Sequence, residues 1–143
     1  MPEYIFFAIQ PADRLNGDFQ QSSTMFELCG VNEVNLKVDG NSVHNHPIKI
    51  RGELPVIPYR LLLDNMQAWF ATDAGQQVSL SHFRDYYVIY SHKFEAENTE
   101  DGWISIELNL DSAFDDAYNL IMWSVVKTKI TIDRFRHIEK TLL

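Results

Sequence analysis

The clearest pattern in this sequence is an alternation of apolar and polar positions with a period of two. In the segment WISIELNL, residues 103–110, every even position is isoleucine or leucine, while Ser105, Glu107 and Asn109 occupy odd positions. Successive side chains of a strand point to opposite faces, so this segment is predicted to be a strand with one face on a core and one in solvent.

A second alternating segment, EVNLKV at residues 33–38, is followed directly by Asp39 and Gly40. This dipeptide readily adopts the positive φ values of a tight hairpin turn. Residues 42–50 then read as the returning strand. Pro47 interrupts that strand and has no N–H for a ladder, which predicts a sheet edge or a bulge there.

Three further segments are apolar almost throughout: YIFFAI, YYVIY and YNLIMWSVVKTKITI, at residues 4–9, 86–90 and 118–132. Their β-branched and aromatic residues favour strands over buried helices. Within the last segment, residues 120–126 are too long and too apolar for an edge strand, so an interior position is expected.

The same strand is expected to continue with Ile130 and Ile132 on its inward face and to end at Asp133. Arg136, three residues beyond Asp133, is expected to be structural. It would pair with a carboxylate such as Asp133 or with a loop carbonyl, and Arg136→Ala would reduce stability or assembly without a nucleic-acid phenotype.

One segment has the spacing of a helix instead. Apolar residues recur every three or four positions from Tyr59 to Phe70, and Pro58 suits a first helical turn, which predicts a helix over residues 58–70. A short second helical turn is expected near residues 79–86, with Ser79 or Ser81 as its cap.

Six to eight short strands with one inserted helix predict an all-β fold, a jelly-roll β-sandwich. The 143 residues are 45% hydrophobic, which is enough to form a core without a disulfide or a metal. We therefore expect a single domain over residues 1–143.

Charge and targeting signals narrow the function. The net charge of −8 argues against unaided binding to nucleic acid or to an anionic membrane, because both require clustered positive charge. The first ten residues do not suit a signal peptide, and no apolar run approaches the roughly 20 residues of a membrane helix. An intracellular protein, cytoplasmic or nuclear, is expected.

The candidate chemistry is sparse. His44 and His46 would share a face of a strand and could chelate a metal, but no third ligand lies nearby in the sequence. Cys29 is the only cysteine, has no catalytic signature around it, and is expected to be a buried free thiol. The sequence has no phosphate-binding loop, nucleophile elbow or zinc-protease motif. No catalytic, cofactor or metal site is therefore expected.

Aromatic residues are the remaining candidates for function. Aromatic side chains on strands are usually core, but large exposed ones often mark contacts with another protein. The residues expected to contact a partner are Trp103, Trp123, Tyr86, Tyr87 and Tyr90.

The order of the segments resembles a known family. The features that carry the resemblance are the apolar strand at 4–9, Asn16-Gly17 with Phe26, Val38-Asp39-Gly40 leading to His46-Pro47, Tyr59 with Leu62 and Leu63, Phe83 to Phe94 with Tyr86, Val88 and Tyr90, Gly102 with 104–110, and Ile132-Asp133 with Arg136 and Ile138. In this order they are similar to the C-terminal jelly roll of the double jelly-roll major capsid proteins of Polinton (Maverick) elements and adintoviruses. The resemblance covers nearly the whole chain.

The resemblance implies a structural protein without catalysis, which assembles with copies of itself, as a trimer or another homo-oligomer, or with another protein. In a capsid it would be located in the virion. The chain departs from the family in having Ser23-Thr24-Met25-Phe26 in place of an Asn-Pro-Phe run, and in having length for one jelly roll rather than two. The expected explanations are a fragment, a single domain, or a host protein that kept one jelly roll.

Two other functions stay open. The first is a domesticated host adaptor that holds a peptide or protein at a sheet edge or groove. The second is a ligand binder of the cupin or lectin kind, for which a clustered His and Glu metal set would be needed.

Overall fold

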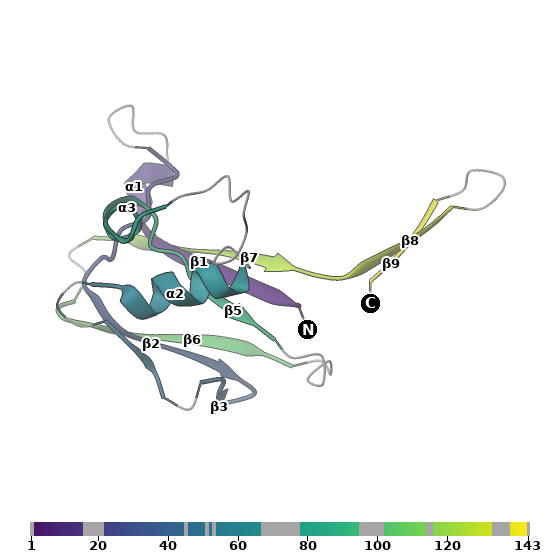
Figure 1. Ribbon diagram of the computed structural model, residues 1–143, viewed down its shortest axis with the longest axis horizontal. Helices are drawn as coiled ribbons and strands as arrows, with labels where there is room; N and C mark the ends of the chain where they lie inside the picture. The colour runs from purple at the N-terminus through teal and green to yellow at the C-terminus, as the bar shows by residue number, and fades with distance from the viewer. Residues whose placement is uncertain are drawn as a thin grey trace.

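The structure, a computed structural model, describes residues 2–15, 22–44, 46–50, 52, 54–66, 78–94, 102–113, 116–132 and 138–142. Two antiparallel sheets face each other (Figure 1). The first sheet has the order β5 (Tyr90–Lys93), β1 (Tyr4–Pro11), β7 (Tyr118–Val125). In the second, β2 (Val31–Val38) pairs with β3 (Asn41–Ser42), β4 (Ile48–Lys49) and β6 (Ile104–Leu110). The fold is thus mostly antiparallel β-structure, consistent with an all-β sandwich.

The core lies between the two sheets. From β1, alternate residues Ile5, Phe7 and Ile9 are buried, and Phe7 stacks on Tyr90 of β5 with ring centroids 5.1 Å apart. The even positions of β6 pack against this core, as the alternation predicts. Burial of such apolar surface is the main force that holds the sheets together.

The predicted hairpin turn after β2 is confirmed. Asp39 and Gly40 have φ values of 50° and 82° and lead into β3. The Asp39 carboxylate also accepts a hydrogen bond from the backbone N–H of Trp103 at 2.9 Å. A Cβ at Gly102 would lie 2.7 Å from that carboxylate, so a larger residue there would require the Asp39 side chain to shift.

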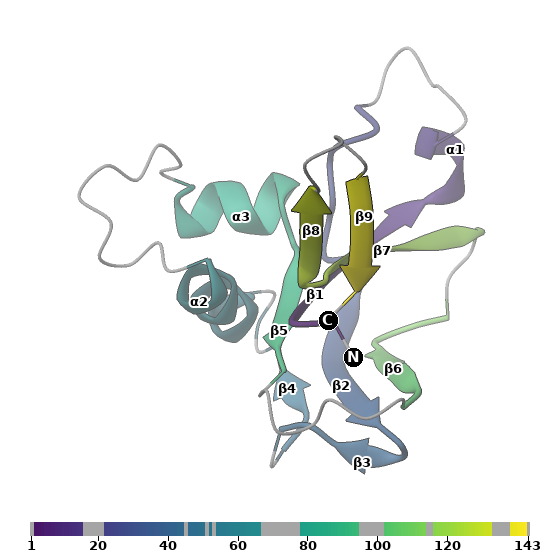
Figure 2. The ribbon, with the colours of Figure 1, turned by 90° about the vertical axis from the view of Figure 1, so that its right-hand side faces the viewer.

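Three helices lie among the described residues: α1 (Ala12–Leu15), α2 (Val56–Asn65) and α3 (Leu80–Tyr86). Helix α2 packs along β5, and α3 lies on the same side of the molecule (Figure 2). The sequence predicted a helix over 58–70, but α2 begins two residues earlier, at Val56. Its first turn is already closed by Tyr59 N–H, which donates to the Pro55 carbonyl at 3.0 Å. Its helical part ends at Asn65, and residues 67–70 lie outside the described residues.

The predicted second helical turn is confirmed as α3, and Ser79 is its cap. The apolar run at 86–90 is a strand only from Tyr90 onward. The backbone before Tyr90 is used differently: Phe26 N–H donates to the Tyr86 carbonyl and Val88 N–H donates to the Phe26 carbonyl, both at 2.9 Å. This segment therefore holds the loop that contains Phe26 instead of extending β5.

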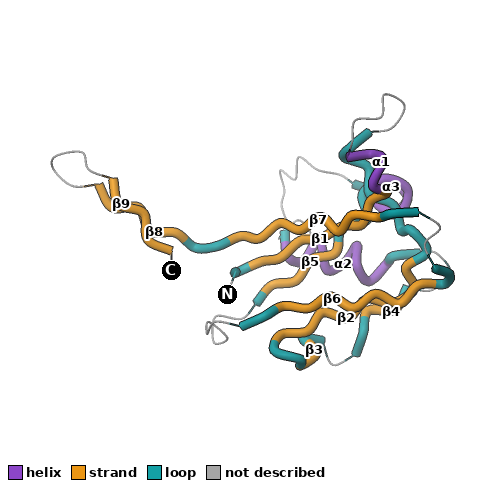
Figure 3. Tube along the Cα trace, turned by 180° about the vertical axis from the view of Figure 1, so that it is seen from behind, coloured by secondary structure: helices purple, strands orange, loops and turns teal. Residues whose placement is uncertain are grey.

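The prediction that residues 120–126 form an interior strand is wrong. Among the described residues, strand β7 is at the edge of the first sheet and pairs only with β1. Beyond it, the chain continues into β8 (Thr128–Ile132), which pairs with β9 (Ile138–Leu142) in a hairpin that projects from the two sheets (Figure 3).

The prediction that Ile130 faces the core is also wrong, because Ile130 lies on this hairpin and is 62% exposed. Asp133, Arg136 and the side chain of Ile132 lie outside the described residues, so their predicted roles stay predictions. Within the described ranges, no helix is long and apolar enough to cross a membrane.

Candidate functional site

Strand β7 forms an unusual sheet edge. Its eight residues, YNLIMWSV, include no charged residue and no proline. Four of its large apolar side chains are exposed, with exposed fractions of 42–55%: Leu120, Met122, Trp123 and Val125. Natural edge strands are usually protected by charges, prolines, bulges or a covering element, and β7 has no covering strand among the described residues.

The hydrogen-bond pattern shows which backbone groups of β7 face outward. Ala12 N–H donates to the Ala117 carbonyl at 2.9 Å, which places odd-numbered residues of this segment in the ladder with β1. In an antiparallel ladder the bonding groups alternate along the strand. The N–H and C=O groups of Leu120, Met122 and Ser124 therefore point away from β1, toward the open edge. We call the residues 118–125 with this open side the β7 edge.

An apolar pocket of about 740 Å³ lies beside the β7 edge, on the face of the first sheet that is turned away from the core. Phe6 and Trp123 are cross-strand partners on this face, and Phe26 meets the Trp123 ring edge-on at 5.6 Å. We call it the outer pocket. Its lining residues are Phe6, Phe26, Leu62, Met66, Val78, His82, Phe83, Tyr87, Ile89 and Trp123.

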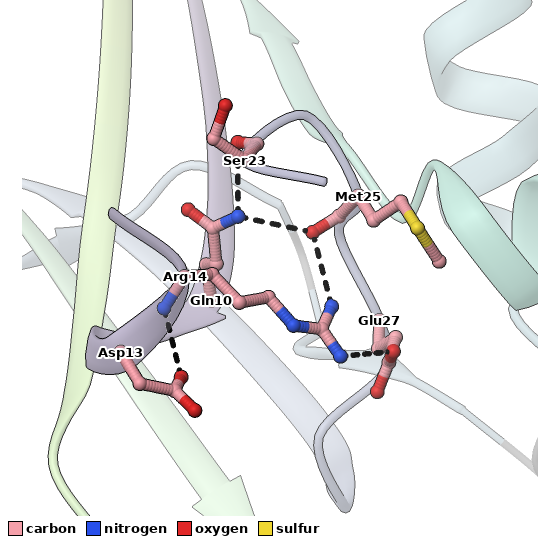
Figure 4. Close-up of polar contacts among 6 residues, drawn as sticks. All are labelled: Gln10, Asp13, Arg14, Ser23, Met25 and Glu27. Atoms are coloured by element: carbon pink, nitrogen blue, oxygen red, sulfur yellow. Dashed lines mark hydrogen bonds and ion pairs between the residues drawn. The ribbon is translucent and has the colours of Figure 1, made fainter. Parts of the chain in front are cut away.

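A buried polar network fixes the wall of the pocket that carries Phe26 (Figure 4). Gln10 is fully buried, and its Nε2 donates to the carbonyls of Ser23 at 2.9 Å and Met25 at 3.3 Å. Arg14 donates to the same Met25 carbonyl and forms an ion pair with Glu27. The Gln10 and Arg14 donors meet at the Met25 carbonyl, so the network determines the path of residues 23–27, although Gln10 Oε1 is buried without a hydrogen-bond partner among the described residues.

Helix α3 supplies the opposite wall. Its Phe83 is fully buried and contacts Tyr59 of α2, with ring centroids 5.3 Å apart. His82 and Tyr87 line the pocket, and Tyr86 lies next to both, at ring distances of 6.3 Å. The aromatic wall therefore depends on the start of α3 being held by Ser79.

The structure brings together three of the five predicted contact residues. Trp123 and Tyr87 line the outer pocket, and Tyr86 is exposed beside it. Trp103 is 60% exposed, but it precedes β6 of the second sheet. Tyr90 is only 2% exposed and is stacked in the core, so the expectation that it contacts a partner does not agree with its position.

Sequence reasoning missed Leu120 and Met122. Their alternation with Ile121 and Trp123 gave no sign that one side of the strand is uncovered. The absence of charge from residues 118–125 is compatible with either an interior strand or an open edge.

The histidines are arranged differently from the predicted pair. His44 contacts His92, with ring centroids 4.9 Å apart, while His46 is exposed. Burial lowers the pKa of His44, and burial together with the neighbouring His44 lowers the pKa of His92 to about 4. The described residues contain no group of three or more His, Cys, Asp or Glu that could hold a metal.

Cys29 is a half-buried free thiol in the turn before β2. Burial, with a contribution from the Glu27 carboxylate, raises its pKa to about 11. A thiol with such a pKa is almost fully protonated at neutral pH and is a poor nucleophile.

Comparisons of the chain with protein-family models, with curated proteins and with solved structures gave no match.

Proposed function

We propose that this chain is a structural assembly module, a capsid-type jelly roll that works by burying its β7 edge against another jelly roll. The observation that supports this most directly is the β7 edge itself, with its outward backbone groups and exposed Leu120, Met122 and Val125. A long apolar edge of this kind is a ready template for strand pairing between chains. The proposed role needs no catalytic residue, cofactor or metal.

One feature of the strand pairing is compatible with the jelly-roll form of the sandwich, although β1 also pairs with β5. β1 pairs with β7 over its whole length, and β2 pairs with β6, so one pairing is nested inside the other along the sequence. Nested pairing of this kind arises when a long antiparallel hairpin folds over into two sheets. It agrees with the sequence resemblance to capsid jelly rolls, in which assembly between such domains is the function.

The test is the oligomeric state of the purified chain, measured by light scattering and sedimentation over a range of concentrations. We expect a dimer or larger species for the wild type. Met122→Lys places a charge in the proposed interface and should raise the dissociation constant by about tenfold or more. Because Met122 is 55% exposed, the melting temperature of the monomer should hardly change.

Asn109→Lys is the matched control, since Asn109 is exposed on β6 of the second sheet. It adds the same charge at a strand away from the proposed interface and should leave the association unchanged. A wild type that remains monomeric at the highest attainable concentration would contradict the assembly role.

The outer pocket favours a second candidate, an adaptor that binds a peptide through apolar side chains. Its volume of about 740 Å³ and its aromatic walls suit one or two large side chains. Selection from a displayed peptide library, repeated with Trp123→Ala, would separate the two roles. Enriched peptides that depend on Trp123, together with a monomeric wild type, would favour the adaptor.

A further inference from the structure

The β8–β9 hairpin stands apart from the two sheets. Figures 1 and 3 show it projecting beyond the end of β7, and neither of its strands makes an extensive contact with any other described element. We call residues 126–142 the arm. Ile130, Lys129 and Thr131 are exposed on it. An isolated two-stranded hairpin is at best marginally stable in water, so an additional strand would stabilise this arm.

The arm and β7 each present an open edge. β7 pairs with β1 and β8 pairs with β9, and the chain passes directly from β7 into β8. Among the described residues no strand pairs with the other side of β7 or of β8. Both strands of this continuous segment therefore have an unpaired edge.

We propose that two copies of this chain exchange their arms, so that β8 of each copy pairs antiparallel with β7 of the other. The proposal rests on the assembly role proposed above and names the occupant of the β7 edge. A two-fold axis close to Val125 places Leu120 of one copy opposite Ile130 of the second copy, and Met122 opposite Thr128. Leu120 and Ile130 are 50% and 62% exposed in the single chain, and this pairing covers both.

Charge favours a second copy as the occupant. Residues 127–140 include five basic and two acidic residues in a chain whose net charge is −8. Antiparallel pairing directs the end of β8 toward the segment that precedes β7 of the second copy, where Asp111 and Asp116 are exposed. The sequence after β8 contains Arg134 and Arg136. A basic arm thus approaches an acidic body.

The test uses two single-cysteine chains, both with Cys29→Ser: one carries Leu120→Cys and the other Ile130→Cys. The two chains carry tags of different mass and are mixed under mild oxidation. Each chain carries a single cysteine, so no link can form inside a chain. Arm exchange predicts a disulfide between the two different chains. Asn109→Cys mixed with Ile130→Cys is the control and should not become linked.

The other outcomes separate the failure of this inference from that of the assembly role. Links of Leu120→Cys chains only to one another would mean that β7 pairs with β7, which overturns arm exchange and leaves assembly intact. An absent link in a chain that sediments as an oligomer would also overturn arm exchange. An absent link in a monomeric chain would overturn both. Melting temperatures of the variants establish that each one is folded.

Discussion

His44 and His92 lie 48 residues apart in the sequence, yet their rings meet between the sheets. His92 also contacts Phe94, with ring centroids 4.8 Å apart, and Nε2 of His44 is buried without a hydrogen-bond partner among the described residues. This environment favours the neutral form of both rings, because charging either ring would cost desolvation energy.

The pKa of His92 should make the stability of the protein depend on pH. It is about 4 in the folded chain and about 6.5 in an unfolded chain. The unfolded state therefore binds more protons between these values, so the stabilisation is complete above about pH 6.5 and is lost as the pH falls toward 4. After allowance for solvent screening, we expect a loss of about 1–2 kcal/mol.

Urea unfolding at pH 7, 5.5 and 4.5 measures this effect. His92→Phe keeps the ring contacts and removes the titrating group, so its unfolding free energy should decline less steeply over that range. His46→Gln, at an exposed position, should follow the wild type. Equal slopes for His92→Phe and the wild type would show that His92 is not responsible.

The residue-scale predictions succeeded where the signal was local. The spacing of His44 and His46 suggested a pair, but the real neighbour of His44 comes from β5, and nothing in a local spacing indicates a partner on another strand. Cys29 was expected to be a buried thiol, and its half-burial and raised pKa support an unreactive group. The hairpin turn at Asp39 and Gly40 could be predicted, because the tendency to adopt positive φ values depends only on these two adjacent residues.

At the scale of elements, helix α3 depends on one cap. Ser79 Oγ accepts the backbone N–H of His82 at 3.2 Å, and it also contacts Ser81 Oγ at 2.9 Å. Phe83 of this short helix is fully buried in the core. The cap thus affects both the core and the aromatic wall of the outer pocket.

Ser79→Ala should lower the free energy of unfolding by about 1 kcal/mol, since an N-cap side chain satisfies a backbone N–H that otherwise has no partner. Ser79→Asp, which can accept the same bond, should retain most of the stability. Ser81→Ala removes a hydroxyl two residues further on and should cost less. Chemical denaturation of the three variants gives the comparison, and a larger loss for Ser81→Ala would assign the cap to Ser81.

The sequence predicts which side chains of a strand face the core, but not where the strand lies in its sheet. Alternation identified the inward positions of β2 and β6, because that pattern follows from the geometry of a single strand. The edge position of β7 was not predicted, because the order of strands depends on pairings between distant segments. Apolar content alone does not distinguish a central strand from an edge that another chain covers. The position of Ile130 was missed for the same reason.

For the whole molecule, charge is divided between a basic arm and an acidic body. Lys129 is exposed on β8, and the rest of the chain holds most of the 20 acidic residues. If the arms are exchanged, part of the attraction between copies is electrostatic and is screened by salt.

Lys129→Glu should therefore weaken the association several-fold at low ionic strength, and the difference from the wild type should diminish near 1 M salt, where the screening length is about 3 Å. Lys49→Glu makes the same change of charge at an exposed position on β4 and should have a smaller effect. Sedimentation at two salt concentrations measures both variants. A similar weakening for both variants would indicate an effect of net charge alone.

The nested pairing of the strands also determines when the chain can fold. β1 is synthesised more than one hundred residues before its long partner β7, since Tyr4 pairs with Val125. Contacts between such distant residues give a high contact order, which slows folding because a large loop must close first. While β7 has not been synthesised, the apolar β1 cannot pair with it, so completion of the first sheet has to follow translation of β7.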